Sequence, residues 1–364
     1  MTVQDITKIL EELAPLAHAE DFDNVGLLVG NPNMPVKGVL VTLDTLENVV
    51  DEAIEKQYNM IVSFHPIIFS GLKKLTGSTY VERVVMKAVT HNIAIYSMHT
   101  ALDNSIMGVN AKICEVLDIK HPKILIPRKG AIKKLTTYAP LKDAEKVKDA
   151  LFAVGAGEIG KYSNCSYSLE GTGSFKAGSN ANPAVGKIGE VHFEKETQIN
   201  VIYTFEKEKK ILEALFEAHP YEEVAHEVVT LENTNQDMGM GMVGTLEHEM
   251  NERDFLLLVK ERMGASVVRH TRLLGKKVRK VAVLGGSGAF AIAAAKRAGA
   301  DVFITADIKY HQFFEAEDQI VIADIGHFET EQFTKDLLVD HLTKKIPNFA
   351  VALSESITNP IKYL

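Results

Sequence analysis

The chain has 364 residues, of which 46% are apolar, and its formal net charge is −8. This length favours two or three domains with sizeable cores, and the acidic balance argues against a general binder of nucleic acids or membrane surfaces. No run of 18 apolar residues occurs and the first residues lack a signal-peptide pattern, so we expect a cytoplasmic protein without a membrane span. The two cysteines, Cys114 and Cys165, fit a reducing compartment better than a disulfide framework.

Strands and helices alternate along residues 1–127, which is the pattern of a parallel α/β sheet. The predicted elements are an amphipathic helix over 3–14, a short strand at 27–29, strands over 39–43, 60–63 and 93–98, and helices ending at 55 and spanning 80–90. Two of these strands run into histidines, His65 and His99, and Asp103 follows four residues after His99. The carboxyl ends of parallel strands are where an α/β sheet binds its ligands.

The central part of the chain has a different character. Residues 121–130 contain proline, glycine and basic residues and are interpreted as a linker. The order β-α-β-β-α-β over residues 128–232 predicts an inserted α+β domain of the ferredoxin-like type. Its predicted strands cover 134–139, 165–169, 188–193, 199–205 and 227–231, with helices over 142–154 and 209–218. The glycine-rich residues 171–175 are interpreted as a flexible hairpin, with ligand binding as the alternative.

Strands and helices alternate again over residues 233–364. A predicted strand at 278–284 runs into Gly285, Gly286, Ser287 and Gly288 before an alanine-rich helix. Such a turn can hold a phosphate on helix N–H groups, or it can simply allow close packing of helix against strand. Its spacing does not match a dinucleotide-binding motif.

Residues 305–331 concentrate side chains typical of a metal site. A buried strand over 320–323 ends shortly before His327, and Glu331 lies four residues later on the same helical face. An imidazole and a carboxylate at this spacing suit a divalent metal, although the same pattern occurs in ordinary solvated first turns. Asp307 and His311 follow the neighbouring strand.

The same pattern occurs twice. Residues 95–103 align without gaps with residues 323–331, so that His99 matches His327 and each is followed by an acid four residues later. We interpret this alignment as a weak internal repeat of two related α/β halves.

Five nitrogen and oxygen ligands are therefore predicted at strand ends of both halves: His65, His99, Asp103, His327 and Glu331. Their number exceeds one structural zinc site and predicts two metals that share a carboxylate and activate a water for hydrolysis. Histidine with carboxylate suits zinc, iron and manganese about equally well.

These segments resemble the GTP cyclohydrolase 1 type 2 homolog family, also called the Nif-three-like family. The resemblance rests on residues 64–69, 99–103, 285–288, 305–311 and 326–331, and on residues 171–173 and 219–223 for the domain inserted in longer bacterial members. It covers essentially the whole chain. It implies two similar α/β halves, 1–127 and 233–364, that form one metal-binding module, an insert at 128–232 similar to PII and CutA proteins, and a toroidal homohexamer.

The family's metal ligands fall on His65, Asp103, His327 and Glu331, with Glu331 as the bridge, and His99 aligns with a site histidine. The family motif has two adjacent histidines before the proline, but this chain has Phe64 in the first position. One metal position therefore loses a ligand. Asp307 and His311 also match the family pattern, and the resemblance implies that they support a ligand or move protons.

Two functional hypotheses follow from the resemblance. The first is a metal-dependent hydrolase of a nucleotide or related small molecule, in which Asp307 or His311 transfers protons. The second is a metal-binding regulatory or scaffold hexamer without catalytic activity, which the PII-like insert and Phe64 favour. Nucleic-acid binding inside a ring is disfavoured by the acidic charge.

Overall fold

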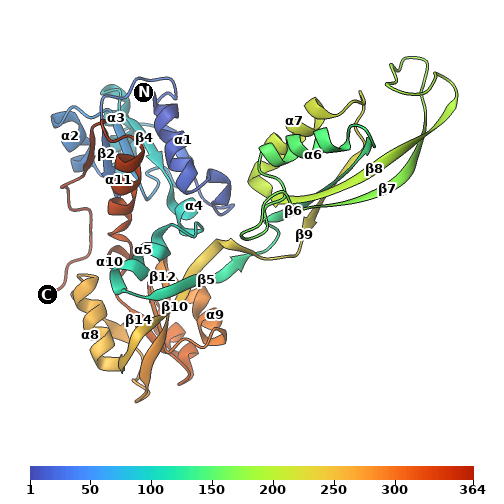
Figure 1. The fold of residues 1–364 in the computed structure, drawn as a ribbon. Helices are drawn as coiled ribbons and strands as arrows, with labels where there is room; N and C mark the ends of the chain where they lie inside the picture. Colours follow the sequence, from blue (N-terminus) through green and yellow to red (C-terminus); the bar gives the residue numbers. More distant parts are fainter. The chain divides into compact units, whose positions relative to one another are not determined.

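The computed structural model describes residues 1–364, which form two compact units (Figure 1). One unit consists of Met1–Pro127 and Gln236–Leu364, and the other of Arg128–Asn235. The first unit contains two sheets and the second contains one, and the predicted α/β fold class is confirmed. No helix of the chain combines the length and the apolar character that a membrane crossing requires.

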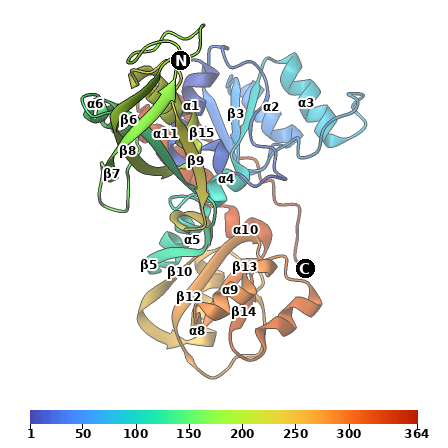
Figure 2. The ribbon, with the colours of Figure 1, turned by 90° about the vertical axis from the view of Figure 1, so that its right-hand side faces the viewer.

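The first sheet has five strands in the order β1-β4-β3-β2-β15, and all neighbours are parallel except β1 and β4. The strands are β1 (Gly26–Val29), β2 (Val39–Thr42), β3 (Met60–Ser63), β4 (Ala94–Ser97) and β15 (Val351–Leu353). Helices α2 (Glu47–Glu55) and α3 (Tyr80–Thr90) cover one face, and α1 (Val3–Leu13) and α11 (Thr334–Lys345) cover the other (Figure 2). Strands β2, β3 and β4 are buried throughout, as parallel strands between two helical layers are.

The second sheet has six strands in the order β11-β14-β13-β12-β10-β5, with β12, β13 and β14 parallel. The strands are β5 (Lys120–Arg128), β10 (Asn235–Asn251), β11 (Arg269–His270), β12 (Lys277–Ser287), β13 (Val302–Ala306) and β14 (Val321–Asp324). One face packs on α9 (Ile292–Arg297) and the other on α5 (Val109–Leu117) and α8 (Glu252–Arg262). Short helical segments complete the unit: η1 (Leu16–His18), α4 (His99–Asp103), η3 (Ala289–Ala291), η4 (Tyr310–Ala316) and α10 (His327–Glu331).

Each sheet contains one strand from the opposite half of the chain. Strand β15, near the C-terminus, pairs with β2 in the first sheet, and β5 pairs with β10 in the second. The interpretation of residues 121–130 as a linker is therefore wrong, because most of this segment is β5. The two prolines, Pro122 and Pro127, fit a strand at the sheet edge, where a missing N–H breaks no inner ladder, while Ile124 and Leu125 are buried.

The second unit has the predicted element order β-α-β-β-α-β. Its elements are β6 (Ile132–Pro140), α6 (Ala144–Ala153), β7 (Ser166–Lys176), β8 (Val191–Thr204), η2 (Phe205–Lys207), α7 (Glu208–Ala218) and β9 (His226–Leu231). The strands pair antiparallel in the order β7-β8-β6-β9 and pack on the two helices through a core of their own.

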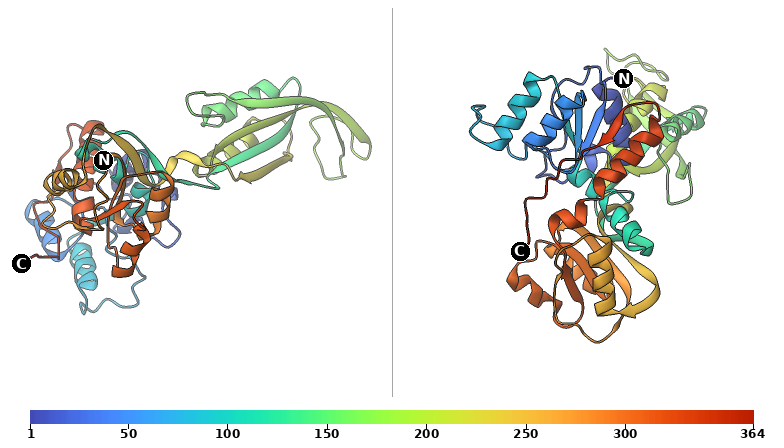
Figure 3. Two further views of the ribbon diagram at one scale, coloured as in Figure 1. Left: turned by 90° about the horizontal axis from the view of Figure 1, so that it is seen from below. Right: turned by 90° about the vertical axis from the view of Figure 1, so that its left-hand side faces the viewer.

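Two details of this unit differ from the sequence prediction. The strands expected at 188–193 and 199–205 are largely one strand, β8, and residues 171–175 lie inside β7 and not in a hairpin. Strands β7 and β8 continue together beyond the core as a long two-stranded ribbon, visible in Figures 1 and 3. The ribbon exposes polar residues and glycine. The sequence therefore lacks the apolar alternation of a buried strand there, although the hydrogen-bonded ladder between β7 and β8 continues.

Candidate metal centre

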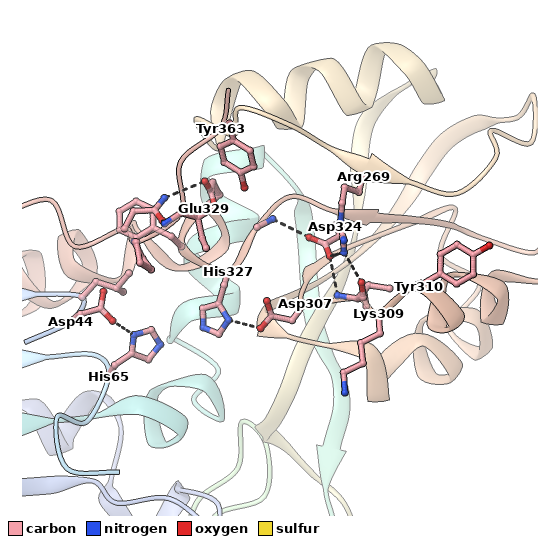
Figure 4. A pocket seen from close by; sticks show the side chains of 17 residues that line it. Asp44, His65, Arg269, Asp307, Lys309, Tyr310, Asp324, His327, Glu329 and Tyr363 are labelled. Carbon is pink, nitrogen blue, oxygen red and sulfur yellow. Dashed lines mark hydrogen bonds and ion pairs between the residues drawn. The ribbon is translucent and has the colours of Figure 1, made fainter. Parts of the chain in front are cut away.

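Three histidines reach one site in the first unit from the carboxyl ends of parallel strands. His65 follows β3, His99 begins α4 after β4, and His327 begins α10 after β14. Helix α10 is only five residues long, and its last residue is Glu331. Figure 4 shows His65 and His327 side by side, although they come from different sheets.

The imidazoles of His65 and His327 face the same carboxylate oxygen. Glu331 Oε2 lies 3.1 Å from His65 Nε2 and 3.1 Å from His327 Nε2. Neither contact has hydrogen-bond geometry, so this oxygen is unpartnered on a side chain that is only 4% exposed. The three ligand atoms lie within 4.8 Å of one another. A buried orphan oxygen opposite two imidazole nitrogens is a donor set that fits a divalent cation.

Each of the three imidazoles is held from behind by an aspartate. The Nδ1-to-carboxylate distances are 2.8 Å for His65 and Asp44, 2.7 Å for His99 and Asp23, and 2.7 Å for His327 and Asp307. When Nδ1–H donates to a carboxylate, Nε2 keeps its lone pair for a metal. The arrangement thus selects the tautomer that a metal ligand needs.

Two of these aspartates are themselves held by a threonine. Thr358 Oγ1 donates to Asp44 Oδ2 at 2.6 Å, while the hydroxyl and the N–H of Thr100 donate to Asp23 Oδ2. Asp307 has no such support and its side chain is 49% exposed. The site is therefore rigid on two sides and open to solvent at Asp307.

Asp103 adds a second orphan atom. Its Oδ1 is buried without a hydrogen-bond partner. Burial, and then the negative charge of Glu331, raise the pKa of the Asp103 carboxyl. A cation at the site would supply the partner that this oxygen lacks, so Asp103 fits the predicted ligand set.

The charges of the cluster are strongly coupled. Burial alone would lower the pKa of His65, but Asp44 and Glu331 outweigh it and raise that pKa to about 10. Burial alone would also lower the pKa of His327, but its neighbours, mainly Glu331, outweigh this effect and raise that pKa to about 9. Burial opposes ionisation of Glu331, yet the two imidazoles lower its pKa. A metal ion that bound here would therefore displace protons.

Phe64 brings no ligand atom to the site. Its side chain is fully buried, and its ring centroid lies 4.9 Å from that of His65 and 5.6 Å from that of His99. The His99 ring lies 5.4 Å from the His65 ring, so a further imidazole stands beside the three clustered ligand atoms.

Asp307 and His311 have different positions. Asp307 bonds to His327 and lines the cavity beside the metal centre. His311 is exposed on η4, where its ring contacts those of Tyr310 and Phe314, and it does not line that cavity. The structure therefore brings Asp307 to the cluster and does not bring His311 there.

The glycine segment at the end of β12 serves packing. Gly285 N–H donates to Asn110 Oδ1 at 3.0 Å and Gly286 N–H donates to Thr330 Oγ1 at 2.9 Å, so neither N–H is free for a phosphate. A Cβ at Gly286 would overlap Glu331 Oε1, and the residue has a φ of +66°. Of the two readings of this turn, close packing is the one that the hydrogen bonds support.

A cavity of about 800 Å³ opens beside His65 and His327 (Figure 4). Asp44 and Asp307 line it next to the two histidines, and the C-terminal residues 359–361 and 363 form part of its wall. Lys309 and Tyr310 also line it, and Lys309 is the only cationic side chain of the lining that makes no ion pair.

Three residues of the site were missed by sequence reasoning: Asp23, Asp44 and Thr358. Asp44 carried a usable signal, because it follows β2 at the same sheet edge as His65. Asp23 lies in a turn-rich loop and Thr358 in the C-terminal segment, and neither has a local pattern that marks it.

Comparisons with known proteins agree over the whole chain. The family model described as Duf34/NIF3 (NGG1p interacting factor 3) matches residues 1–360. A Bacillus subtilis protein named GTP cyclohydrolase 1 type 2 homolog is 39% identical over 367 residues, which cover 99% of this chain and 98% of that protein. The crystal structure of a Bacillus cereus protein related to NIF3 is similar with a TM-score of 0.85 and 35% identity, covering 100% of this chain and 99% of the other. Staphylococcus aureus protein SA1388 gives a TM-score of 0.80 at 29% identity, with the same coverage.

Proposed function

Since the chain belongs to the Duf34/NIF3 family, we propose that it is a divalent-metal-dependent hydrolase of a nucleotide or related small molecule. The orphan Oε2 of Glu331 between the Nε2 atoms of His65 and His327 is the observation that carries the proposal. The relatives' name, GTP cyclohydrolase 1 type 2 homolog, suggests GTP, but no lining residue is specific for guanine.

We assign two metal ions to the site, with zinc, iron and manganese as candidates. Glu331 would be shared by the two ions, and His65, Asp103 and His327 would be further ligands. His99 would be the imidazole available to the position that Phe64 deprives of one. The unpartnered Asp103 Oδ1 and the aspartate behind each imidazole support this assignment.

When bound, such ions supply Lewis-acid activation of water and of the bond to be cleaved. Asp44 and Asp23 hold the imidazoles in one tautomer and one orientation. Asp307 bonds to His327 through one oxygen, while its exposed carboxylate also faces the cavity, where it can accept a proton. His311 is the second candidate for proton transfer, and its position on η4 restricts it to substrates that extend beyond the cavity.

Lys309 and the aromatic rings of the cavity favour a substrate of mixed character. The ammonium of Lys309 lacks an ion-pair partner and would bind an anionic group such as phosphate. Tyr310 and Tyr363 offer ring surfaces to an aromatic group. Both features suit a nucleotide.

Elemental analysis of native protein tests the metal assignment. We expect about two metal ions per chain in the wild type and their loss in His327→Ala. About one ion per chain, rising to two in Phe64→His, would mean that Phe64 disables a position and would favour the regulatory alternative. No metal after gentle purification would overturn the proposal. Hydrolysis should then be measured on a nucleotide and phosphoester panel, with and without a chelator.

The alternative is a regulatory or scaffold homohexamer, toroidal in form, that binds metal without catalysis. Phe64 favours it, and so does a second unit whose β-α-β-β-α-β order is that of ferredoxin-like inserts similar to PII and CutA proteins. Metal-loaded protein that is inert on the whole panel and sediments as a hexamer would support it. A monomer with saturable activity would exclude it.

A further inference from the structure

We propose that the second unit carries a binding site of its own for a small organic cation, separate in sequence and chemistry from the metal centre. A cavity of about 470 Å³ lies within this unit, which is a volume typical of small-molecule sites. It is lined by aromatic rings from β6, from β7 and from the loop after α7, by three glutamates, and by small residues of the loop after β7.

The aromatic walls come from Tyr138, Phe175 and Tyr221. The ring centroids of Phe175 and Tyr221 lie 6.2 Å apart with their planes tilted by 58°, and Phe175 also contacts His192. Tyr221 is fixed at its far end because its hydroxyl donates to Glu196 Oε1 at 2.9 Å. Rings held in this way present their faces without losing further rotamer freedom on binding.

His219 explains why Tyr221 is held so firmly. Its side chain is buried, its Nε2–H donates to the carbonyl of Tyr138 at 2.9 Å, and its Nδ1 accepts the N–H of Tyr221 at 3.1 Å. Both ring nitrogens are thus occupied. His219 positions two walls of the cavity and is not itself free to bind a ligand.

The charge of the lining selects a cation. Glu196, Glu222 and Glu223 line the cavity, against one cationic residue, Lys176. Glu222 accepts one backbone N–H, from Asn182, and Glu223 forms no ion pair or hydrogen bond.

Gly173 keeps the cavity open to Glu196. A Cβ at this position would overlap the Glu196 carboxylate, so the glycine of β7 leaves room for that charge beside the rings. Carboxylates attract a positive charge, and aromatic faces attract an organic ammonium through their quadrupoles. The remaining apolar wall suits an alkyl chain, so the ligand class is an alkylammonium compound.

Three probes with the same six-carbon body separate charge from hydrophobicity: hexylammonium, 1-hexanol and hexanoate. Each is titrated into the full-length protein, with binding followed by ligand-observed NMR. We expect hexylammonium to bind at least about tenfold tighter than 1-hexanol and hexanoate to bind weakest. Equal affinities for hexylammonium and 1-hexanol, or a preference for hexanoate, would overturn the proposal.

Variants locate the binding site. Phe175→Leu, Glu196→Gln and Glu223→Gln should each weaken hexylammonium binding at least about threefold, whereas Glu217→Gln, an exposed glutamate of the same unit outside the lining, should not. Glu223 is exposed, so its variant keeps the test valid if another variant misfolds, which circular dichroism would detect. Binding that none of the three variants changes would refute this location.

The metal centre provides the last control. His327→Ala should bind hexylammonium as the wild type does, because the cavity lies wholly within residues 128–235. Loss of binding in His327→Ala would assign the cation to the other unit and overturn the inference.

Discussion

Thr358 is connected to the candidate metal centre through one intermediate residue. It is buried, and its hydroxyl bonds to Asp44, whose other oxygen holds His65. With both of its oxygens engaged, the Asp44 carboxylate keeps the His65 ring in one orientation. A residue of the C-terminal segment thereby supports a proposed ligand from the first half of the chain.

We predict that Thr358→Val weakens metal affinity about tenfold, because the aspartate behind His65 loses its second anchor. Thr358→Ser keeps the hydroxyl and should bind metal nearly as the wild type does. Competition with a chromophoric chelator measures both affinities. If the valine variant matched the wild type, or if serine were as weak as valine, the hydroxyl would have no such role.

Gly286 tests how closely the end of β12 packs on Glu331. Gly286→Ala should both destabilise the fold and abolish metal binding, because the added Cβ overlaps Glu331 Oε1. Gly275→Ala is the matched control: it has a similar φ of +75° but open space around the new Cβ, so it should cost only about 1 kcal/mol of backbone strain and retain the metal. Metal content and urea unfolding of both variants decide the matter. Equal behaviour of the two would refute a packing role.

At the scale of the elements, helix α2 is tied to the segment after β15 by one carboxylate. Glu52 accepts hydrogen bonds from the hydroxyls of Ser354 and Ser356, from the N–H of Glu355, and from Lys56. Burial alone would raise the pKa of Glu52, but these donors lower it from 4.5 to about 2. The bonds anchor the start of the segment that carries Thr358.

We predict that Glu52→Gln lowers the free energy of unfolding by about 1–3 kcal/mol at pH 7. The folded-state pKa lies below the unfolded one, so the stability due to the carboxylate is present above pH 4.5 and is lost as pH falls toward 2. The difference between wild type and variant should therefore shrink over this range. Urea unfolding at pH 7, 4 and 3 measures it, with the exposed Glu55→Gln of the same helix as control. A difference that stays constant with pH would contradict the assignment.

At the scale of the whole molecule, the second unit is inserted in the sequence between β5 and β10, two strands that pair with each other. Gly239 of β10 lies against Ile126 of β5, and Gly244 lies against Lys120, so the two strands run antiparallel. Each unit also has its own core. A short turn could therefore join Pro127 to Gln236 without disturbing the sheet.

We predict that replacing residues 128–235 by a short glycine-containing turn leaves the metal content of the first unit unchanged and abolishes hexylammonium binding. Elemental analysis and the NMR titration test the two parts separately. Loss of metal from a folded deletion variant would mean that the second unit contributes to the metal centre. Retained hexylammonium binding would place that site in the first unit.

The sequence alone determined the alternation of strands and helices, the family resemblance that the comparisons confirm, and the gathering of His65, His327 and Glu331. These follow from local periodicity and from the rule that parallel strands present their carboxyl ends at one edge. Only the tertiary structure decided that β5 and β15 each join the sheet of the other half of the chain, and that His311 points outward. It also decided that the N–H groups of Gly285 and Gly286 bond to side chains. It also decided the bond between Thr358 and Asp44, which are 314 residues apart. Contacts of this kind depend on how whole elements pack, and no local pattern of residues encodes them.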